Sequence, residues 1–105
     1  MAQMVVIYNT PKDPAAFDRH YFEIHVPLAK KLAGLRSYEV STGPVATISG
    51  GFSVHLIATL HFDDLAAIQD AFASPEGQAC REDRMIFAPD ETDFKMFLFD
   101  DREVL

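Results

Sequence analysis

The chain has few of the residues that mark disulfide-rich, metal-binding or membrane proteins. Its 105 residues include a single cysteine, Cys80, so no disulfide can form within the chain. No C-x-x-C, H-x-H or H-E-x-x-H spacing occurs, which leaves a dedicated metal site without a sequence signature. No apolar run reaches the roughly 18 residues that a membrane-spanning helix requires.

Basic residues are also scarce. Nine lysines and arginines stand against 16 aspartates and glutamates, which gives a formal net charge of −7. Such a charge argues against nucleic acid and anionic membrane surfaces as partners. The first residues, MAQMVVIYNTP, lack the basic segment and long apolar core of a signal peptide, and the low cysteine content favours a reducing compartment. We therefore expect a cytoplasmic protein with one domain, residues 1–105.

The most informative stretch runs from Asp13 to Leu35. Its apolar residues recur at spacings of four, three, four and four, which predicts one long amphipathic helix. They are Phe17, Tyr21, Ile24, Leu28 and Leu32. His25 faces the interior with this stripe. Pro27 has no N–H for the carbonyl of Glu23, and its ring would contact that carbonyl, so a kink or break is expected at His25–Pro27.

Two interpretations of His25 remain open at this point. In the structural one, the buried imidazole bonds to the carbonyl that Pro27 leaves free. In the functional one, it transfers protons in a pocket beside the distorted turn. Spacing alone favours the structural role.

Four segments have the composition of β-strands. Met4–Tyr8 contains no polar group other than a phenol and predicts a central strand buried on both faces. Leu35–Thr42 alternates and carries Tyr38 on its more apolar face, either as a structural hydrogen-bonding group or as a pocket acid. Phe94–Phe99 is the last strand.

Ser53–Phe62 is the clearest strand, with one wholly apolar face and His55 and His61 on the other. These histidines stand about 20 Å apart along the strand, so they cannot share a metal ion. The spacing does not decide whether they face a cleft, an interface or a strand edge.

The order of elements predicts an α+β, ferredoxin-like split βαβ fold with a four-stranded antiparallel sheet. A helix begins at Asp63–Asp64, and a shorter one is expected from about Gly77 to Phe87. The helices cover one face of the sheet, and the other face is also apolar. A second copy would bury that face at roughly 800 Å² per partner, so a homodimer with stacked sheets is expected.

Three segments give the chain a resemblance to a known family. They are F-x3-Y-F-x2-H-V-P-L at Phe17–Leu28, A-G-L-R-S-Y-E-V at Ala33–Val40 and S-P-E-G-Q-A at Ser74–Ala79. With these motifs the sequence resembles the EthD-like family (ethyl tert-butyl ether degradation EthD) of the dimeric α+β barrel superfamily. The resemblance implies a dimer with a cleft between the helices and the sheet of each protomer.

The resemblance also implies a chemistry. Similar barrels include polyketide cyclases and muconolactone-type isomerases, in which cleft histidines and tyrosines move protons without a cofactor. His25 and Tyr38 match positions of that kind. We therefore expect a hydrophobic, aromatic or lactone-like ligand, with His25 as general base or acid, Tyr38 as a donor to a developing oxyanion and His55 as a third candidate.

Three alternatives stay open. The protein could be a non-catalytic accessory or ligand-carrying dimer in a degradation pathway. It could be a haem- or quinol-linked oxidoreductase or monooxygenase of the same superfamily, with His25 as haem ligand; nothing in the sequence supports nicotinamide binding. It could also be an interaction module in which the histidines only fill the core, and a cleft smaller than a ligand (~300 Å³) would favour that reading.

Overall fold

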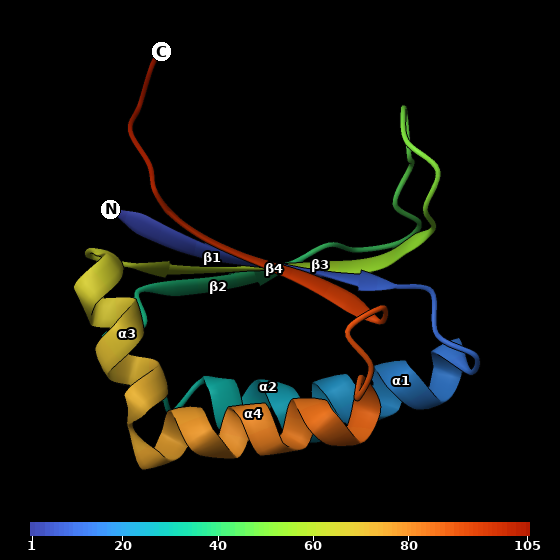
Figure 1. Cartoon of the computed structure of the whole chain (residues 1–105), viewed down its shortest axis with the longest axis horizontal. Coiled ribbons are helices and arrows are strands. Elements are labelled where there is room, and N and C mark those ends of the chain that lie inside the picture. Colours follow the sequence, from blue (N-terminus) through green and yellow to red (C-terminus); the bar gives the residue numbers. More distant parts are fainter.

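A four-stranded antiparallel sheet with all its helices on one face forms the protein (Figure 1). The computed structural model describes all 105 residues. The strand order is β2–β3–β1–β4, and every neighbouring pair is antiparallel. The strands are β1 (Ala2–Asn9), β2 (Ser37–Val40), β3 (Val54–Phe62) and β4 (Phe94–Asp100). The predicted ferredoxin-like α+β fold is confirmed.

The helical layer is built from two segments of the chain, each starting at a capped end. The helices are α1 (Pro14–His20), a π-helical turn η1 (Tyr21–His25), α2 (Val26–Ala29), α3 (Leu65–Ala73) and α4 (Pro75–Phe87). The Asp13 carboxylate accepts from the N–H of Ala16, and Asp64 does the same for Ala67, which satisfies free donors at both starts. None of the helices is long and apolar enough to cross a membrane.

The helix after α3 is longer than the sequence predicts. We expected a short helix from Gly77, but α4 has 13 residues and starts at Pro75. The hydroxyl of Ser74 accepts from the N–H of Gly77, and Pro75 occupies the first turn, where its missing N–H costs nothing. Ser74-Pro75 therefore starts a helix as well as ending the previous one.

The distortion predicted around Pro27 is present, and it takes the form of a π turn. The N–H of Val26 donates to the carbonyl of Tyr21, five residues back. The wider turn keeps every fourth residue on the inner face, and these residues are all buried: Phe17, Tyr21, His25 and Ala29. Ile24 is 47% exposed, so its predicted place in the buried stripe was wrong. The helix also ends earlier than predicted, at Ala29 instead of Leu35.

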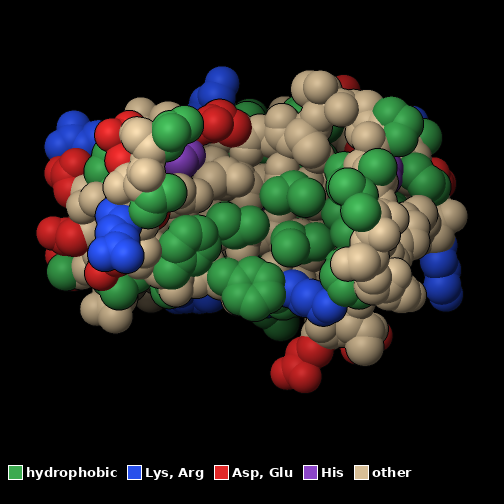
Figure 2. All heavy atoms as spheres, turned by 90° about the horizontal axis from the view of Figure 1, so that it is seen from above, with side chains coloured by type: hydrophobic (Ala, Val, Ile, Leu, Met, Phe, Trp, Pro, Cys, Tyr) green, Lys and Arg blue, Asp and Glu red, His purple; other side chains and the backbone are tan.

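The two faces of the sheet have different surroundings. On β1, Met4, Val6 and Tyr8 are buried against the helices, while the intervening residues are half-buried. In the single chain, burial of this strand on both faces was therefore a wrong prediction. The open face carries an apolar patch, seen in green at the centre of Figure 2. The strand register assigns it to Val5, Ile7, Ile57, Phe97 and Phe99.

Candidate functional site

A small cavity lies between the helices and the covered face of the sheet, and it brings two predicted residues together. His25 from η1 and Tyr38 from β2 both line it, with Tyr21 beside them. Its volume is about 40 Å³. That space holds one or two water molecules, or the reacting end of a larger molecule. Twelve of its 15 lining residues are hydrophobic, so a polar group inside it would meet few competing partners.

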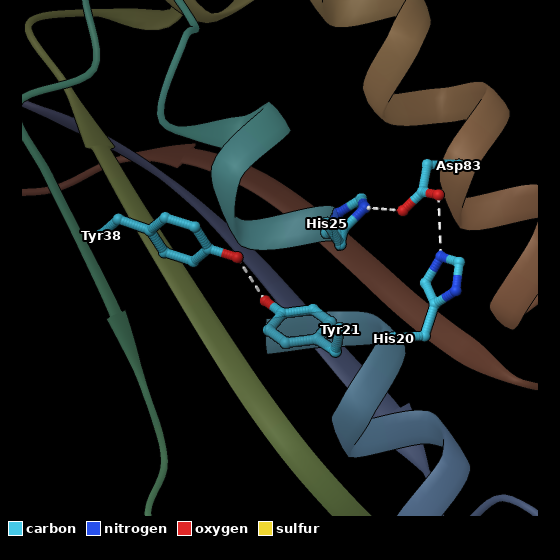
Figure 3. A network of polar contacts seen from close by, with 5 residues as sticks. All are labelled: His20, Tyr21, His25, Tyr38 and Asp83. Carbon is cyan, nitrogen blue, oxygen red and sulfur yellow. Dashed lines mark hydrogen bonds and ion pairs between the residues drawn. The ribbon is translucent and has the colours of Figure 1, made fainter. Parts of the chain in front are cut away.

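A buried aspartate on α4 holds His25 in place (Figure 3). The Nδ1 atom of His25 lies 2.9 Å from Oδ2 of Asp83, and the Nε2 atom of His20 lies 2.8 Å from Oδ1 of the same carboxyl group. His25 and Asp83 are 8% and 6% exposed. Because a carboxylate only accepts hydrogen bonds, each imidazole donates an N–H to it. The structural interpretation in which His25 bonds to the Glu23 carbonyl is not what the structure shows.

The hydrogen bond to Asp83 determines which ring nitrogen of His25 carries the proton. With Nδ1–H bound to Asp83, the neutral ring carries its lone pair on Nε2, which has no hydrogen-bond partner in the protein. Burial lowers the pKa of His25 below its usual 6.5, and the adjacent Asp83 carboxylate opposes that shift only in part. His25 is thus neutral at neutral pH and can accept a proton.

A pair of tyrosines forms the other polar group of the cavity. The hydroxyls of Tyr21 and Tyr38 lie 2.5 Å apart and point toward each other from η1 and β2 (Figure 3). Burial raises the pKa of Tyr38 to about 12, and it raises the pKa of Tyr21 as well. Both phenols stay protonated near neutral pH, so together they offer one hydroxyl proton beyond the one used between them.

Aromatic rings fix these side chains in place. The ring of Tyr21 lies 5.3 Å from that of His25, and Phe87 packs edge-on against His25 at 4.8 Å. Tyr8 and Phe17 pack against the other sides of Tyr21. Such contacts restrict ring rotation, so the imidazole of His25 and the phenol of Tyr21 keep their directions without a bound ligand.

A wider apolar groove lies next to the cavity, along the edge strand β4. The groove has a volume of about 370 Å³, which is within the size range of small-molecule sites. The two hollows have five lining residues in common: Met4, Phe72, Arg81, Arg84 and Met96. The cavity alone is too small for the ligand that we expected, but cavity and groove together are not.

The other histidines lie elsewhere. The register of β1 and β3 shifts between Tyr8 and Asn9, opposite His55, and this irregularity interrupts the strict alternation of sides. His55 contacts Phe17 and lies 2.7 Å from the Asp18 carboxylate on α1, away from the cavity. His61 is on the open face, 2.9 Å from Glu39. His55 is therefore not placed to act together with His25 and Tyr38.

Sequence reasoning missed Asp83 and His20, and it treated Tyr21 only as part of an apolar stripe. A signal for Asp83 was available, since it falls at helical spacing with Gly77, Cys80 and Phe87 on the packed side of α4. An acidic residue on such a stripe needs a buried partner. Cys80 is buried there too, and burial raises the pKa of its thiol, which makes it a weak nucleophile.

The residues present do not suit a haem or a metal ion. The cavity lined by His25 has a volume of about 40 Å³, which is far smaller than a haem macrocycle, so a haem has no room at the free Nε2 of this ring. No group of three or more histidine, cysteine, aspartate or glutamate side chains has the geometry to hold a metal ion.

Fold and site together define a ferredoxin-like α+β protein in which a buried histidine and a pair of tyrosines line a small cavity next to an apolar groove. The EthD domain model matches residues 9–91, and the chain belongs to this family. A protein of Rhodococcus erythropolis, described as an uncharacterized 11.0 kDa protein in the thcB-thcC intergenic region, is 38% identical over 89 residues, 84% of either chain. The resemblance seen in the sequence motifs is confirmed.

Solved structures agree with this assignment. An EthD family protein from Bacillus halodurans is 29% identical, with a TM-score of 0.85 over 97% of this chain and 99% of that one. SnoaB from Streptomyces nogalater, described as a cofactor-independent oxygenase, is 18% identical, with a TM-score of 0.66 over 99% and 95%. A dimeric ferredoxin-like protein from Thermobifida fusca is 13% identical, with a TM-score of 0.66 over 93% and 88%. The last two show the fold alone.

Proposed function

We propose that this protein is a cytoplasmic homodimer that binds a hydrophobic, aromatic or lactone-like metabolite and moves a proton on it without a cofactor. One observation carries the proposal. His25 is held through Nδ1 by a buried carboxylate, its Nε2 is left without a partner, and its ring lines the same cavity as Tyr38. This is the arrangement that a general base requires.

The chemistry assigns one role to each group. Nε2 of His25 takes a proton from a carbon next to a carbonyl of the ligand, and the electron pair of that C–H bond moves toward the carbonyl oxygen. The hydroxyl pair of Tyr21 and Tyr38 donates a hydrogen bond to the oxygen as its charge grows. Asp83 stabilises the imidazolium that forms. Return of the proton to another atom of the ligand completes an isomerisation or a cyclisation.

The sizes of the two hollows support a ligand with two parts. The cavity admits only a small polar end, such as a carbonyl, next to His25 and Tyr38. The groove accommodates an apolar body about the size of an aromatic ring system. This division favours a metabolite over a purely structural role for the histidine.

Dimerisation is proposed from the open face of the sheet. Phe97 and Phe99 are 49% and 40% exposed there, in a patch that continues over three strands. A second copy laid on this face would remove the patch from water. Proteins with this fold are described as dimeric, which supports the proposal.

The experiment for the catalytic role compares two histidines. Lactones, quinones and polyphenols are offered to the wild-type protein, to His25→Ala and to the matched control His55→Ala. We expect turnover to fall about 10²- to 10⁴-fold in His25→Ala and to persist in His55→Ala. Wild-type turnover in His25→Ala would contradict the proposal. Binding without turnover by the wild-type protein would favour the ligand-carrying alternative.

The dimer is tested separately, by light scattering of the purified protein. We expect twice the mass of one chain, and the mass of one chain for Phe97→Glu, because a charge in a buried interface opposes association. A wild-type protein with the mass of one chain would contradict the dimer and leave the proposed site untouched.

A further inference from the structure

We propose that the groove along β4 selects amphipathic carboxylates, with Arg81 and Arg84 binding the carboxylate and the apolar wall binding the rest of the ligand. This inference rests on the proposed function, since it names the class of molecule that the same site takes. It depends on three observations: an uncovered apolar wall, two arginines without acidic partners, and the position of both arginines where groove and cavity meet.

The wall of the groove is apolar and lies open. Met96 and Leu98 of β4 face the helices, because they pair with Val6 and Met4 of β1, yet they are 44% and 47% exposed. Ile68 and Phe72 of α3 form the opposite side. Six of the nine lining residues are hydrophobic. A hydrophobic molecule bound here would bury surface that no part of this chain covers.

Two arginines also line the groove, beside the apolar wall. Arg81 and Arg84 are three residues apart on α4 and therefore project from the same side of the helix. Nη1 of Arg81 donates to the carbonyl of Phe72, at 2.7 Å. Nη1 of Arg84 donates to the carbonyl of Ala88, at 2.9 Å, and its guanidinium lies 4.3 Å from the centre of the Phe94 ring. Both heads are oriented by the protein before any ligand arrives.

Neither guanidinium has a carboxylate partner. No acidic side chain lies within 4.0 Å of either one, although the chain has a formal net charge of −7. In contrast, the exposed Arg36 forms a bidentate salt bridge with Asp63. Each guanidinium carries five N–H donors, and one of them donates to a backbone carbonyl. The remaining donors can bind an anion.

The position of the arginines favours a carboxylate over a neutral group. Both line the cavity as well as the groove, so an anion held by them lies between the two hollows. A planar carboxylate fits the fork of a guanidinium, and the adjacent carbons of the ligand then reach toward His25 while its apolar body lies against β4. A neutral ligand of the same shape would lose these charge-assisted bonds.

The test uses two molecules that differ only in the polar end, naphthalene-2-carboxylate and naphthalene-2-carboxamide. Binding is followed by NMR of the methionine methyl groups. Met4 and Met96 line the groove, whereas the exposed Met1 and Met85 do not and serve as internal references. We expect the carboxylate to shift the signals of Met4 and Met96, and to bind at least tenfold more tightly than the carboxamide.

Variants assign that preference to the arginines. In Arg81→Gln/Arg84→Gln we expect the carboxylate to bind only as tightly as the carboxamide, with carboxamide affinity unchanged. In the control Arg36→Gln the tenfold preference should remain. Raising the salt concentration should weaken carboxylate binding to the wild-type protein and leave carboxamide binding unaltered. This measurement needs no variant, so it stands even if the double variant does not fold.

The outcomes separate this inference from the proposed function. Equal affinity for both molecules in the wild-type protein, or a preference that survives in the double variant, would overturn the inference and leave the apolar groove as a binding site. If neither molecule shifts Met4 or Met96, the inference and the proposed ligand site both fail.

Discussion

Two of the histidine–aspartate pairs in the chain, His25–Asp83 and His55–Asp18, have nearly equal lengths but different surroundings. His25 lies 2.9 Å from Asp83, and the two side chains are 11% and 7% exposed. His55 lies 2.7 Å from Asp18, and those side chains are 19% and 48% exposed. The first pair borders a cavity lined by tyrosines, and the second borders an open hollow near the β2–β3 loop.

The comparison shows that the distance within a pair does not define a site. In the exposed pair, water competes for the carboxylate, so the contact contributes little free energy. In the buried pair, the protein shields Asp83 and His25 from solvent, so loss of the carboxylate leaves the N–H of His25 without an acceptor. Because it is buried, the first pair contributes more to stability than the second. Burial also holds the imidazole of His25 in one orientation.

The largest expected difference comes from removing each carboxylate. Asp83→Ala should lower the free energy of unfolding by about 3 kcal/mol, because the buried imidazole of His25 and the half-buried one of His20 lose their acceptor. The control Asp18→Ala should cost less than about 1 kcal/mol. Urea unfolding measures both values. Equal losses in the two variants would mean that burial does not distinguish the pairs.

A smaller effect is expected from the tyrosines that only the buried pair has beside it. Tyr38→Phe should cost about 1–2 kcal/mol, because the hydroxyl of Tyr21 is then left without its partner. Tyr21→Phe removes the same hydrogen bond from the other side, so the double variant should cost less than the sum of the two. Additive losses, measured by the same unfolding experiment, would argue against a bond between these hydroxyls.

The smallest expected effect tests whether the π turn is what places His25 in the interior. The π turn places His25 inside and Ile24 outside, so Ile24→Ser should change the free energy of unfolding by no more than about 0.5 kcal/mol. Leu32→Ser, at a buried position of the same segment, is the control and should cost several times more. A large loss in Ile24→Ser would mean that the turn is an ordinary α-helical one.

Much of the fold could be predicted from the sequence because apolar spacing determines which residues are buried. The alternating residues of Ser53–Phe62 and the order of the elements were sufficient for the sheet and its covered face. Ile24 was misplaced because a 3.6-residue period assumes regular α-helical turns, and a π turn changes which residues face inward. Pro27 indicated where the distortion occurs, but not which kind it would be.

The site was less predictable, because its partners are far apart in the sequence. His25 and Asp83 are separated by 58 residues, and only the packing of α4 against η1 brings them together. Tyr38 was chosen because it lies on the more apolar face of its strand, which is correct, but its bond to Tyr21 depends on how the helical layer packs on the sheet. His55 was a candidate because strand alternation predicts only the face on which a side chain lies. It does not predict which residues that side chain contacts.

The protonation of His25 tests the central claim most directly. Nitrogen-15 NMR of the four histidines reports for each ring which nitrogen carries the proton and at what pH the second proton binds. We predict a neutral His25 ring at pH 7, protonated on Nδ1 and free on Nε2, with a titration midpoint below 6.5, because burial disfavours its charged form. A His25 that is protonated on Nε2, or doubly protonated at pH 7, would contradict the account.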